Sequence, residues 1–176
     1  MALETYKLEQ YIKNDRYVNF SMESIGSDNL GLLGEPRRNS FYQIMILEKG
    51  SATYFVDFEK HEITAPAVCF VFPQQIFKYD LCPDASGDII MFDETIFCSE
   101  ILSNELKEYN VDLHKRINYV DFSGEKAKFD EILMIKGQIE SLWKSLNNIR
   151  KVEIKFLIKI IIFKIIDTSA GDLTVV

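Results

Sequence analysis

The sequence has few of the residues that usually carry metal or disulfide chemistry. Its two histidines, His61 and His114, fall in different expected elements, and neither has a second histidine beside it at metal-ligand spacing. A metal site needs several converging ligands, so we expect no bound metal and no cofactor. The three cysteines, Cys69, Cys82 and Cys98, lie far apart and form no Cys-x-x-Cys pair. Neither a disulfide framework nor a zinc cluster is indicated, which favours a reducing, cytoplasmic location.

Catalytic motifs are also missing. The sequence contains no Gly-x-Ser-x-Gly elbow, no phosphate-binding loop and no Gly-x-Gly-x-x-Gly turn. Cys69 lies in an apolar run, where burial should raise the pKa of its thiol and make it a poor nucleophile. Asp57, Glu59 and Glu62 are close in sequence, but the charge of a solvated turn explains them better than an acid–base pair does. We therefore expect that the chain is not an enzyme.

Long apolar runs and basic excess are lacking as well. The most apolar stretch, residues 154–166, is interrupted by lysines and is shorter than the roughly 20 residues of a membrane helix. The chain has 20 Lys and Arg against 27 Asp and Glu, a net charge of −7. That sign opposes binding to a phosphate backbone. We expect no membrane and no nucleic acid as a direct partner of this chain.

The residues that are present form two patterns. With 47 % hydrophobic and 12 % aromatic residues, the 176-residue chain can bury one substantial core. Residues 1–122 predict an antiparallel β-sandwich or barrel with a short helix near 95–109, and residues 123–176 predict a helical hairpin. The expected strands are 17–24, 41–47, 52–57, 68–72, 76–81 and 89–92, and the hairpin helices are 125–146 and 150–167.

Five short motifs in the strand region carry a family resemblance. They are residues 37–44 (RRNSFYQI), 48–51 (EKGS), 56–58 (VDF), 73–77 (PQQIF) and 87–92 (GDIIMF). In order, in spacing and in the change from strands to helices, the chain resembles the N-terminal sensor domain of AraC-type transcription regulators, over nearly its whole length. The resemblance implies a cupin-like barrel, of the double-stranded β-helix or jelly-roll kind, followed by an α-helical hairpin.

The resemblance also implies a function. In this family the barrel binds a small effector, the hairpin dimerises, and a separate C-terminal helix-turn-helix segment binds promoter DNA. The chain is therefore expected to be the effector-binding and dimerisation domain of such a regulator. It would sense a sugar or another small organic molecule as a homodimer, and the helix-turn-helix segment is expected to be absent from this chain.

The family's pocket positions match Lys49, Phe77, Tyr79, Ile89 and Met91 in this sequence. Lys49 and Tyr79 would orient the ligand, and the other three would form an apolar wall. Phe77 stands where the family usually has histidine, at the end of its Pro-Gly-Gln-x-His run, so the pocket is expected to be less polar than a sugar site.

The second hairpin helix suggests how the chain dimerises. Leu157, Ile161 and Ile165 are spaced by four residues and predict one apolar stripe. Lys151, Lys155 and Lys159 also recur every four residues and predict the solvent-exposed side of this helix. The alternative is that this stripe packs only on the chain's own barrel.

Two other functions fit the same residues. One is a free-standing cupin enzyme or small-molecule-binding protein, and the other is a barrel with a solid interior that only dimerises. Metal-binding cupins carry a His-x-His pair and a further histidine on their strands, which this sequence lacks. A metal-dependent cupin enzyme is accordingly disfavoured.

Overall fold

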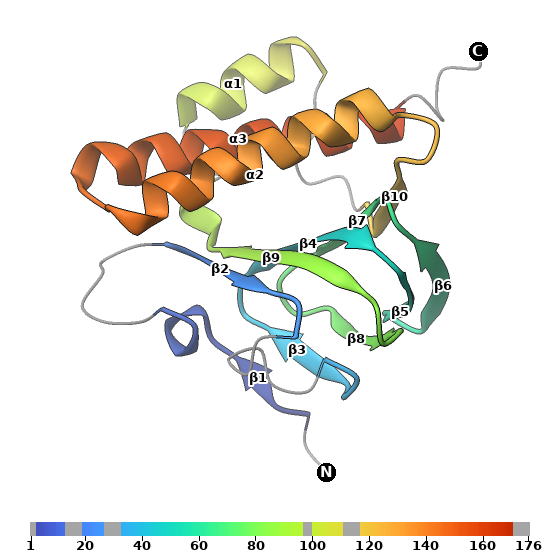
Figure 1. Cartoon of the computed structure of the whole chain (residues 1–176). Coiled ribbons are helices and arrows are strands. Elements are labelled where there is room, and N and C mark those ends of the chain that lie inside the picture. Colours follow the sequence, from blue (N-terminus) through green and yellow to red (C-terminus); the bar gives the residue numbers. More distant parts are fainter. Residues whose placement is uncertain (1–2, 13–18, 27–32, 97–99, 111–116, 171–176) are drawn as a thin grey trace. The chain divides into compact units, whose positions relative to one another are not determined.

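The computed structural model of the chain describes residues 3–12, 19–26, 33–96, 100–110 and 117–170 (Figure 1). It divides the chain into two compact units. The strand unit comprises Met1–Glu94 with Asn118–Ser123, and the helical unit comprises Thr95–Ile117 with Gly124–Val176. Two residues considered above, Cys98 and His114, lie outside the described residues.

The strand unit consists of two five-stranded sheets. The first has the order β1-β3-β8-β5-β6 and the second the order β10-β7-β4-β9-β2. The strands are β1 Thr5–Tyr6, β2 Phe20–Ser24, β3 Arg37–Asn39, β4 Tyr42–Lys49, β5 Ser51–Val56, β6 Glu59–Thr64, β7 Ala67–Val71, β8 Ile76–Leu81, β9 Ser86–Phe92 and β10 Tyr119–Asp121. β1 pairs with β3 in parallel, and the other described pairs are antiparallel.

The expected β-rich region followed by helices is present, but in the described part of the chain the strands form two sheets and no closed barrel. The placement of Glu59 and Glu62 in a turn is wrong, because both belong to β6. β6 is an edge strand, and Ile63 is its one fully buried residue. Because most residues of β6 are charged or exposed, its sequence lacks the alternating hydrophobic pattern that predicts a strand.

The inner faces of the two sheets share one hydrophobic cluster. Figure 1 shows the sheets facing each other, and the side chains that alternate inward from both of them meet between them. The cluster includes Met45, Leu47, Tyr54, Val56, Cys69, Val71, Phe77, Tyr79, Ile89 and Met91. β4 lies between β7 and β9 in the middle of its sheet, and its first six residues are all buried. The core of this unit is therefore the space between the sheets.

One turn of the strand unit needs unusual backbone angles. The β5–β6 hairpin turns on Asp57 and Phe58, whose φ angles are 45° and 73°. The Asp57 carboxylate fixes this turn by accepting hydrogen bonds from Gln75 Nε2 (2.8 Å) and from the Ile76 backbone N–H (3.1 Å). Phe58 is fully exposed at the tip. The strain of these positive φ values is thus held by the neighbouring β7–β8 turn.

The helical unit contains α1 (Glu100–Glu108), α2 (Lys126–Lys144) and α3 (Asn148–Ala170). Asn147 caps α3, because its side-chain Oδ1 accepts a hydrogen bond from the Arg150 backbone N–H at 2.9 Å. α2 and α3 pack side by side, and Lys128 pairs with Asp167 across them at 3.2 Å. None of the described helices combines the length and the hydropathy needed to cross a membrane.

Candidate ligand site and dimer surface

Aromatic rings dominate one side of the space between the sheets. Tyr54 on β5 and Tyr79 on β8 are register partners, and their rings stack with centroids 4.7 Å apart. Phe77 meets Tyr79 edge-on at 5.7 Å. Neighbouring strands hold these rings on the inner face because residues two apart point the same way.

Burial keeps the titratable groups of this interior neutral. It raises the pKa of both Tyr54 and Tyr79 well above the ordinary tyrosine value, and it raises the pKa of the Cys69 thiol. The Tyr54 hydroxyl donates a hydrogen bond to the Phe70 carbonyl at 3.3 Å. The interior therefore offers neutral hydroxyls, and the Cys69 thiol is not a nucleophile at neutral pH.

Two amide side chains lie in the same interior. Asn39 on β3 and Gln43 on β4 are 1 % and 2 % exposed. Asn39 Nδ2 donates a hydrogen bond to Gln43 Oε1 at 3.1 Å, which links the two sheets. Gln43 lies directly opposite Met91 on one side and Val71 on the other, so it points inward with the cluster.

Three polar atoms of these side chains are buried without a hydrogen-bond partner: Asn39 Oδ1, Gln43 Nε2 and the Tyr79 hydroxyl. Gln43 and Tyr54 lie close enough to the Tyr79 hydroxyl for weak hydrogen-bonding interactions that act on its pKa, although neither meets it in full hydrogen-bond geometry. An unpaired buried group costs about 1–3 kcal/mol, so folded proteins keep few of them. Three such atoms in one interior therefore need an explanation.

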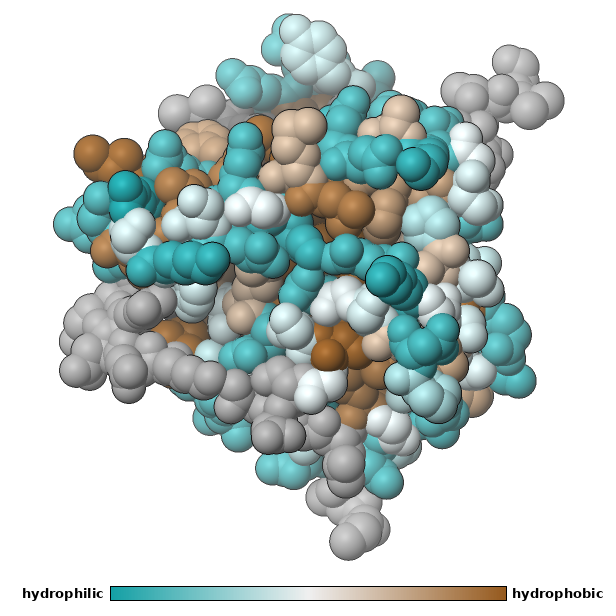
Figure 2. All heavy atoms as spheres, in the orientation of Figure 1, coloured by the Kyte–Doolittle hydropathy of each residue, from teal (hydrophilic) through white to brown (hydrophobic). Residues whose placement is uncertain are grey.

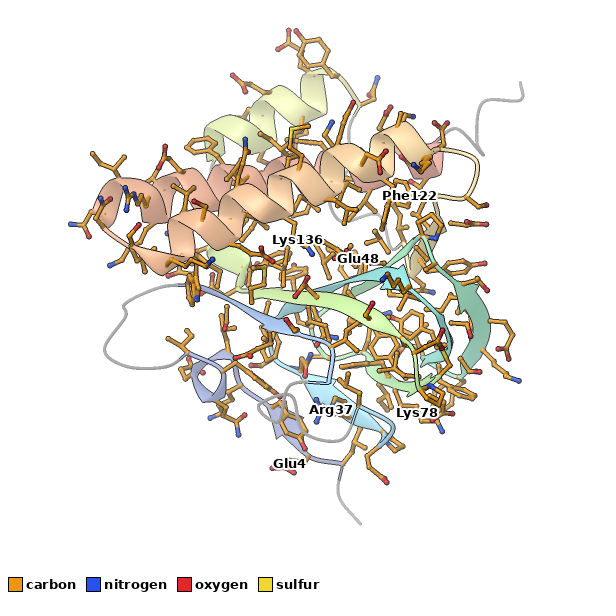
Figure 3. The ribbon with its side chains drawn as sticks, in the orientation of Figure 1. Glu4, Arg37, Glu48, Lys78, Phe122 and Lys136 are labelled. Carbon is orange, nitrogen blue, oxygen red and sulfur yellow. The ribbon has the colours of Figure 1, made fainter. Side chains whose placement is uncertain are left out.

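The buried cation near this interior has neighbours of its own. The Arg37 guanidinium, labelled in Figure 3, lies over the Tyr6 ring at 4.2 Å from the ring centroid. It also lies beside Tyr11, where it lowers the hydroxyl pKa while the larger effect of burial raises it. Tyr11 in turn meets Phe41 edge-on at 5.7 Å. Two tyrosines of the N-terminal segment thus lie against the Arg37 guanidinium.

The structure brings four of the five expected ligand residues together. Phe77, Tyr79, Ile89 and Met91 belong to the shared cluster, although no ligand contact is shown for any of them. Lys49 is exposed at the end of β4. The β4–β9 register shifts between Leu47 and Lys49, so the alternation that placed Lys49 on the inner face does not continue to it.

Sequence reasoning did not assign the two buried amides to the site. Asn39 and Gln43 both lie in the first family motif, and their positions alternate with Phe41 and Met45 along one face. A polar residue that recurs at inward positions of an apolar strand was the available signal. It could not be used without knowing that β3 faces β4.

The carboxylates and histidine weighed above have structural partners. Asp57 fixes its turn, and Glu59 contacts His61 Nε2 at 3.3 Å and accepts a hydrogen bond from Asn118 Nδ2 at 3.4 Å. Within the described ranges, no three His, Cys, Asp or Glu side chains gather closely enough to hold a metal ion.

The helical unit carries a second candidate surface. A groove of about 500 Å³ runs between α2 and α3 and is lined by Gln138, Ser141, Leu142, Glu153, Phe156 and Leu157. An exposed apolar stripe on α3 continues from it and consists of Ile149, Val152, Phe156 and Ile160. Figure 2 shows apolar side chains interrupting the polar surface over the helices.

The residues expected to mediate dimerisation divide between the two faces of α3. Leu157 lines the groove. Ile161 and Ile165 are 0 % and 3 % exposed, whereas Phe156 is 58 % exposed. The apolar face that α3 leaves in water is therefore the one centred on Phe156.

Comparison with known proteins finds likenesses among solved structures. No protein-family model and no curated protein matches the chain. The similar solved structures include ToxT from Vibrio cholerae, with a TM-score of 0.46 and 10 % identity over 84 % of this chain and 56 % of ToxT. They also include the AraC-like transcriptional activator CuxR, with a TM-score of 0.41 and 11 % identity over 86 % of this chain and 49 % of CuxR. The chain spans about half the length of each. At these TM-scores neither likeness establishes a shared fold.

Proposed function

We propose that the chain is the effector-binding and dimerisation domain of a cytoplasmic AraC-type transcription regulator, with a cupin-type strand unit. The family motifs support this proposal, because several of them border one interior. Residues 37–44 form β3 and the start of β4, residues 73–77 lead into β8, and residues 87–92 lie in β9. Inner-face residues from all three belong to the shared cluster.

The observation that carries the proposal is the unpaired polar group inside this interior. A binding pocket combines mostly apolar walls with a few placed polar groups. The space between the sheets has aromatic and methionine side chains around the unpaired atoms of Asn39, Gln43 and Tyr79. In a solid core these atoms would have no hydrogen-bond partners, whereas a small organic effector would supply them.

In this proposal DNA is bound by another segment of the regulator. The described helices of this chain serve a different purpose, which is to pair two copies. The exposed stripe of α3 and its groove are the proposed dimer interface, and Leu157 remains part of it. Ile161 and Ile165 support the interface from within the helical unit.

The sequence of α3 is self-complementary about Phe156, which favours a second copy as the occupant of this surface. Val152 and Ile160 lie four residues before and after Phe156, and Glu153 and Lys159 lie three before and after. Two antiparallel α3 helices crossing at Phe156 would set Val152 against the partner's Ile160. Glu153 would then face the partner's Lys159.

A charge exchange tests this pairing. Glu153→Lys and Lys159→Glu should each weaken the dimer, since each sets like charges against each other across the twofold axis. The double variant should restore most of the affinity. Light scattering at tens of micromolar should report the dimer mass for the native chain and the double variant. A monomeric native chain would contradict the interface.

A reporter assay tests the regulatory function. The chain is fused to a DNA-binding domain that represses only when dimerised, and repression is measured while candidate metabolites are supplied. We expect repression that depends on Phe156 and that changes with one class of metabolite. In parallel, a true effector at about 100 times its Kd should stabilise the purified chain by about 2.7 kcal/mol. Metabolite turnover by the purified chain would instead indicate an enzyme.

A further inference from the structure

The unpaired atoms between the sheets have a definite chemical character. Asn39 Oδ1 is an acceptor, Gln43 Nε2 is a donor, and the Tyr79 hydroxyl can donate or accept. The first two are joined through the Asn39–Gln43 hydrogen bond, and Gln43 is a polar neighbour of Tyr79. The three groups therefore form one connected cluster on β3, β4 and β8.

This character does not depend on how the two amides are oriented. If both amides were rotated, Gln43 Nε2 would donate to Asn39 Oδ1. The unpaired atoms would then be Asn39 Nδ2, a donor, and Gln43 Oε1, an acceptor. Either way the pair leaves one donor and one acceptor, and the tyrosine adds a hydroxyl.

No member of this cluster is charged. Burial holds the pKa of Tyr79 well above its ordinary value, so its hydroxyl keeps its proton. The neighbouring cation, Arg37, lies against Tyr6 and Tyr11. Asp57, whose charge acts on Tyr54, is hydrogen-bonded in its own turn. A charged ligand group would be desolvated here without an opposite charge in the cluster, which is costly.

We propose that Asn39, Gln43 and Tyr79 form the polar anchor of the effector site and select an uncharged group with a donor and an acceptor on neighbouring atoms. A primary amide carried on an apolar body has this chemistry. The inference rests on the proposed function, since it names the ligand class of the same interior. Met91 lies opposite Gln43 and Phe77 lies edge-on to Tyr79, so the apolar body would contact both.

The first test needs no ligand. Gln43→Met keeps the side-chain volume and removes the unpaired Nε2 donor, but it also removes the Oε1 that accepts from Asn39 Nδ2. The two effects oppose each other, so the melting temperature of the free chain should fall by no more than about 2–4 °C. Gln75→Met is the matched control. Gln75 is also buried, but its Oε1 accepts from the Phe72 N–H at 2.8 Å and its Nε2 donates to Asp57. Gln75→Met loses both of these hydrogen bonds and removes no unpaired group, so the control should melt lower than Gln43→Met.

Equal losses in the two variants would overturn the proposal. That result would mean that Gln43 is satisfied in the free chain, for instance by a structural water, and is not held ready for a ligand.

The second test uses three probes of similar size: benzamide, benzoate and ethylbenzene. Benzamide should raise the melting temperature of the native chain most, because it alone offers a neutral donor and acceptor. Gln43→Met should abolish that rise. A stronger response to benzoate, an unchanged benzamide response in the variant, or no response to any probe would overturn the ligand class.

The two proposals can fail separately. Benzamide binding that depends on Gln43, together with a reporter that never responds to a metabolite, would support the proposed binding site and contradict the regulatory function. A reporter that responds to a charged effector would support the regulatory function and contradict the proposal that the site selects an uncharged group.

Discussion

The two units of this protein depart from ordinary burial in opposite directions. The described strand unit hides polar groups in its core, whereas the helical unit shows apolar groups on its surface. The buried polar residues of the strand unit are Ser21, Arg37, Asn39, Gln43, Gln75 and Asp88. The exposed large apolar residues of the helical unit are Tyr109, Met134, Ile149, Val152, Phe156 and Ile160.

The contrast indicates where each unit acts. Buried polar groups and exposed apolar patches are the informative exceptions to the rule that apolar residues lie inside. Apart from the exposed Phe58 and Tyr119, the strand unit keeps its exceptions inside, where a small molecule would meet them. The helical unit keeps its exceptions outside, where another protein surface would cover them. Each of the following changes acts on one side of this contrast.

The largest effect is expected from adding a side chain at Gly87, where β9 approaches β4 closely. Gly87 has φ +154°, and an added Cβ would lie 1.9 Å from the Ile46 carbonyl oxygen. Gly87→Ala should therefore destabilise the strand unit by more than about 4 kcal/mol, measured by denaturant unfolding. Gly124→Ala is the control, because nothing lies within 4 Å of its added Cβ. Similar stability of the two variants would show that β4 and β9 do not approach this closely.

The next effect concerns the apolar surface of the helical unit. Phe156→Asp should weaken dimerisation by about 2–4 kcal/mol, because it sets a charge at the centre of the proposed interface. Met134→Asp also charges an exposed apolar position, but one that does not line the groove, and should leave the dimer mass unchanged. Sedimentation of both variants against the native chain measures the difference. Equal weakening of the dimer by both variants would mean that Phe156 is not the centre of the dimer interface.

A smaller effect separates the two stacked tyrosines. Tyr54→Phe removes the hydroxyl that donates to the Phe70 carbonyl and should cost about 0.5–1.5 kcal/mol of unfolding free energy. Tyr79→Phe removes an unpaired hydroxyl and should cost nothing or stabilise the free chain. The two rings are stacked partners of similar burial, so each variant is the control of the other. An equal cost for both would remove Tyr79 from the unpaired cluster.

The smallest effect is expected at the β5–β6 turn. Phe58 is fully exposed at φ 73°, a conformation that asparagine adopts more readily. Phe58→Asn should raise the free energy of unfolding by up to about 1 kcal/mol, as chemical denaturation would show. Phe58→Ala removes the same ring but lacks the short polar side chain that lets asparagine hydrogen-bond locally at positive φ, and should give less. A larger gain from alanine would assign the effect to the exposed ring.

Local patterns in the sequence determined most of the strand unit. The runs that became β4, β5, β7, β8 and β9 were predicted because each alternates or is continuously apolar, and strand alternation also placed Phe77 with Tyr79 on one face. β1, β3, β6 and β10 were missed. β6 and β10 carry charges, have few buried residues and pair at a sheet edge, so their pairing depends on neighbours distant in sequence.

Only the tertiary structure decided the site and the faces of α3. The facing of β3 and β4 makes Asn39 and Gln43 neighbours, and the register shift before Lys49 removes that residue from the interior. Residues 149–166 are apolar on several sides of α3, so the sequence could not tell which face stays in water. Packing covers Ile161 and leaves Phe156 exposed. Local periodicity fixes which element forms, whereas contacts between distant elements decide what each face meets.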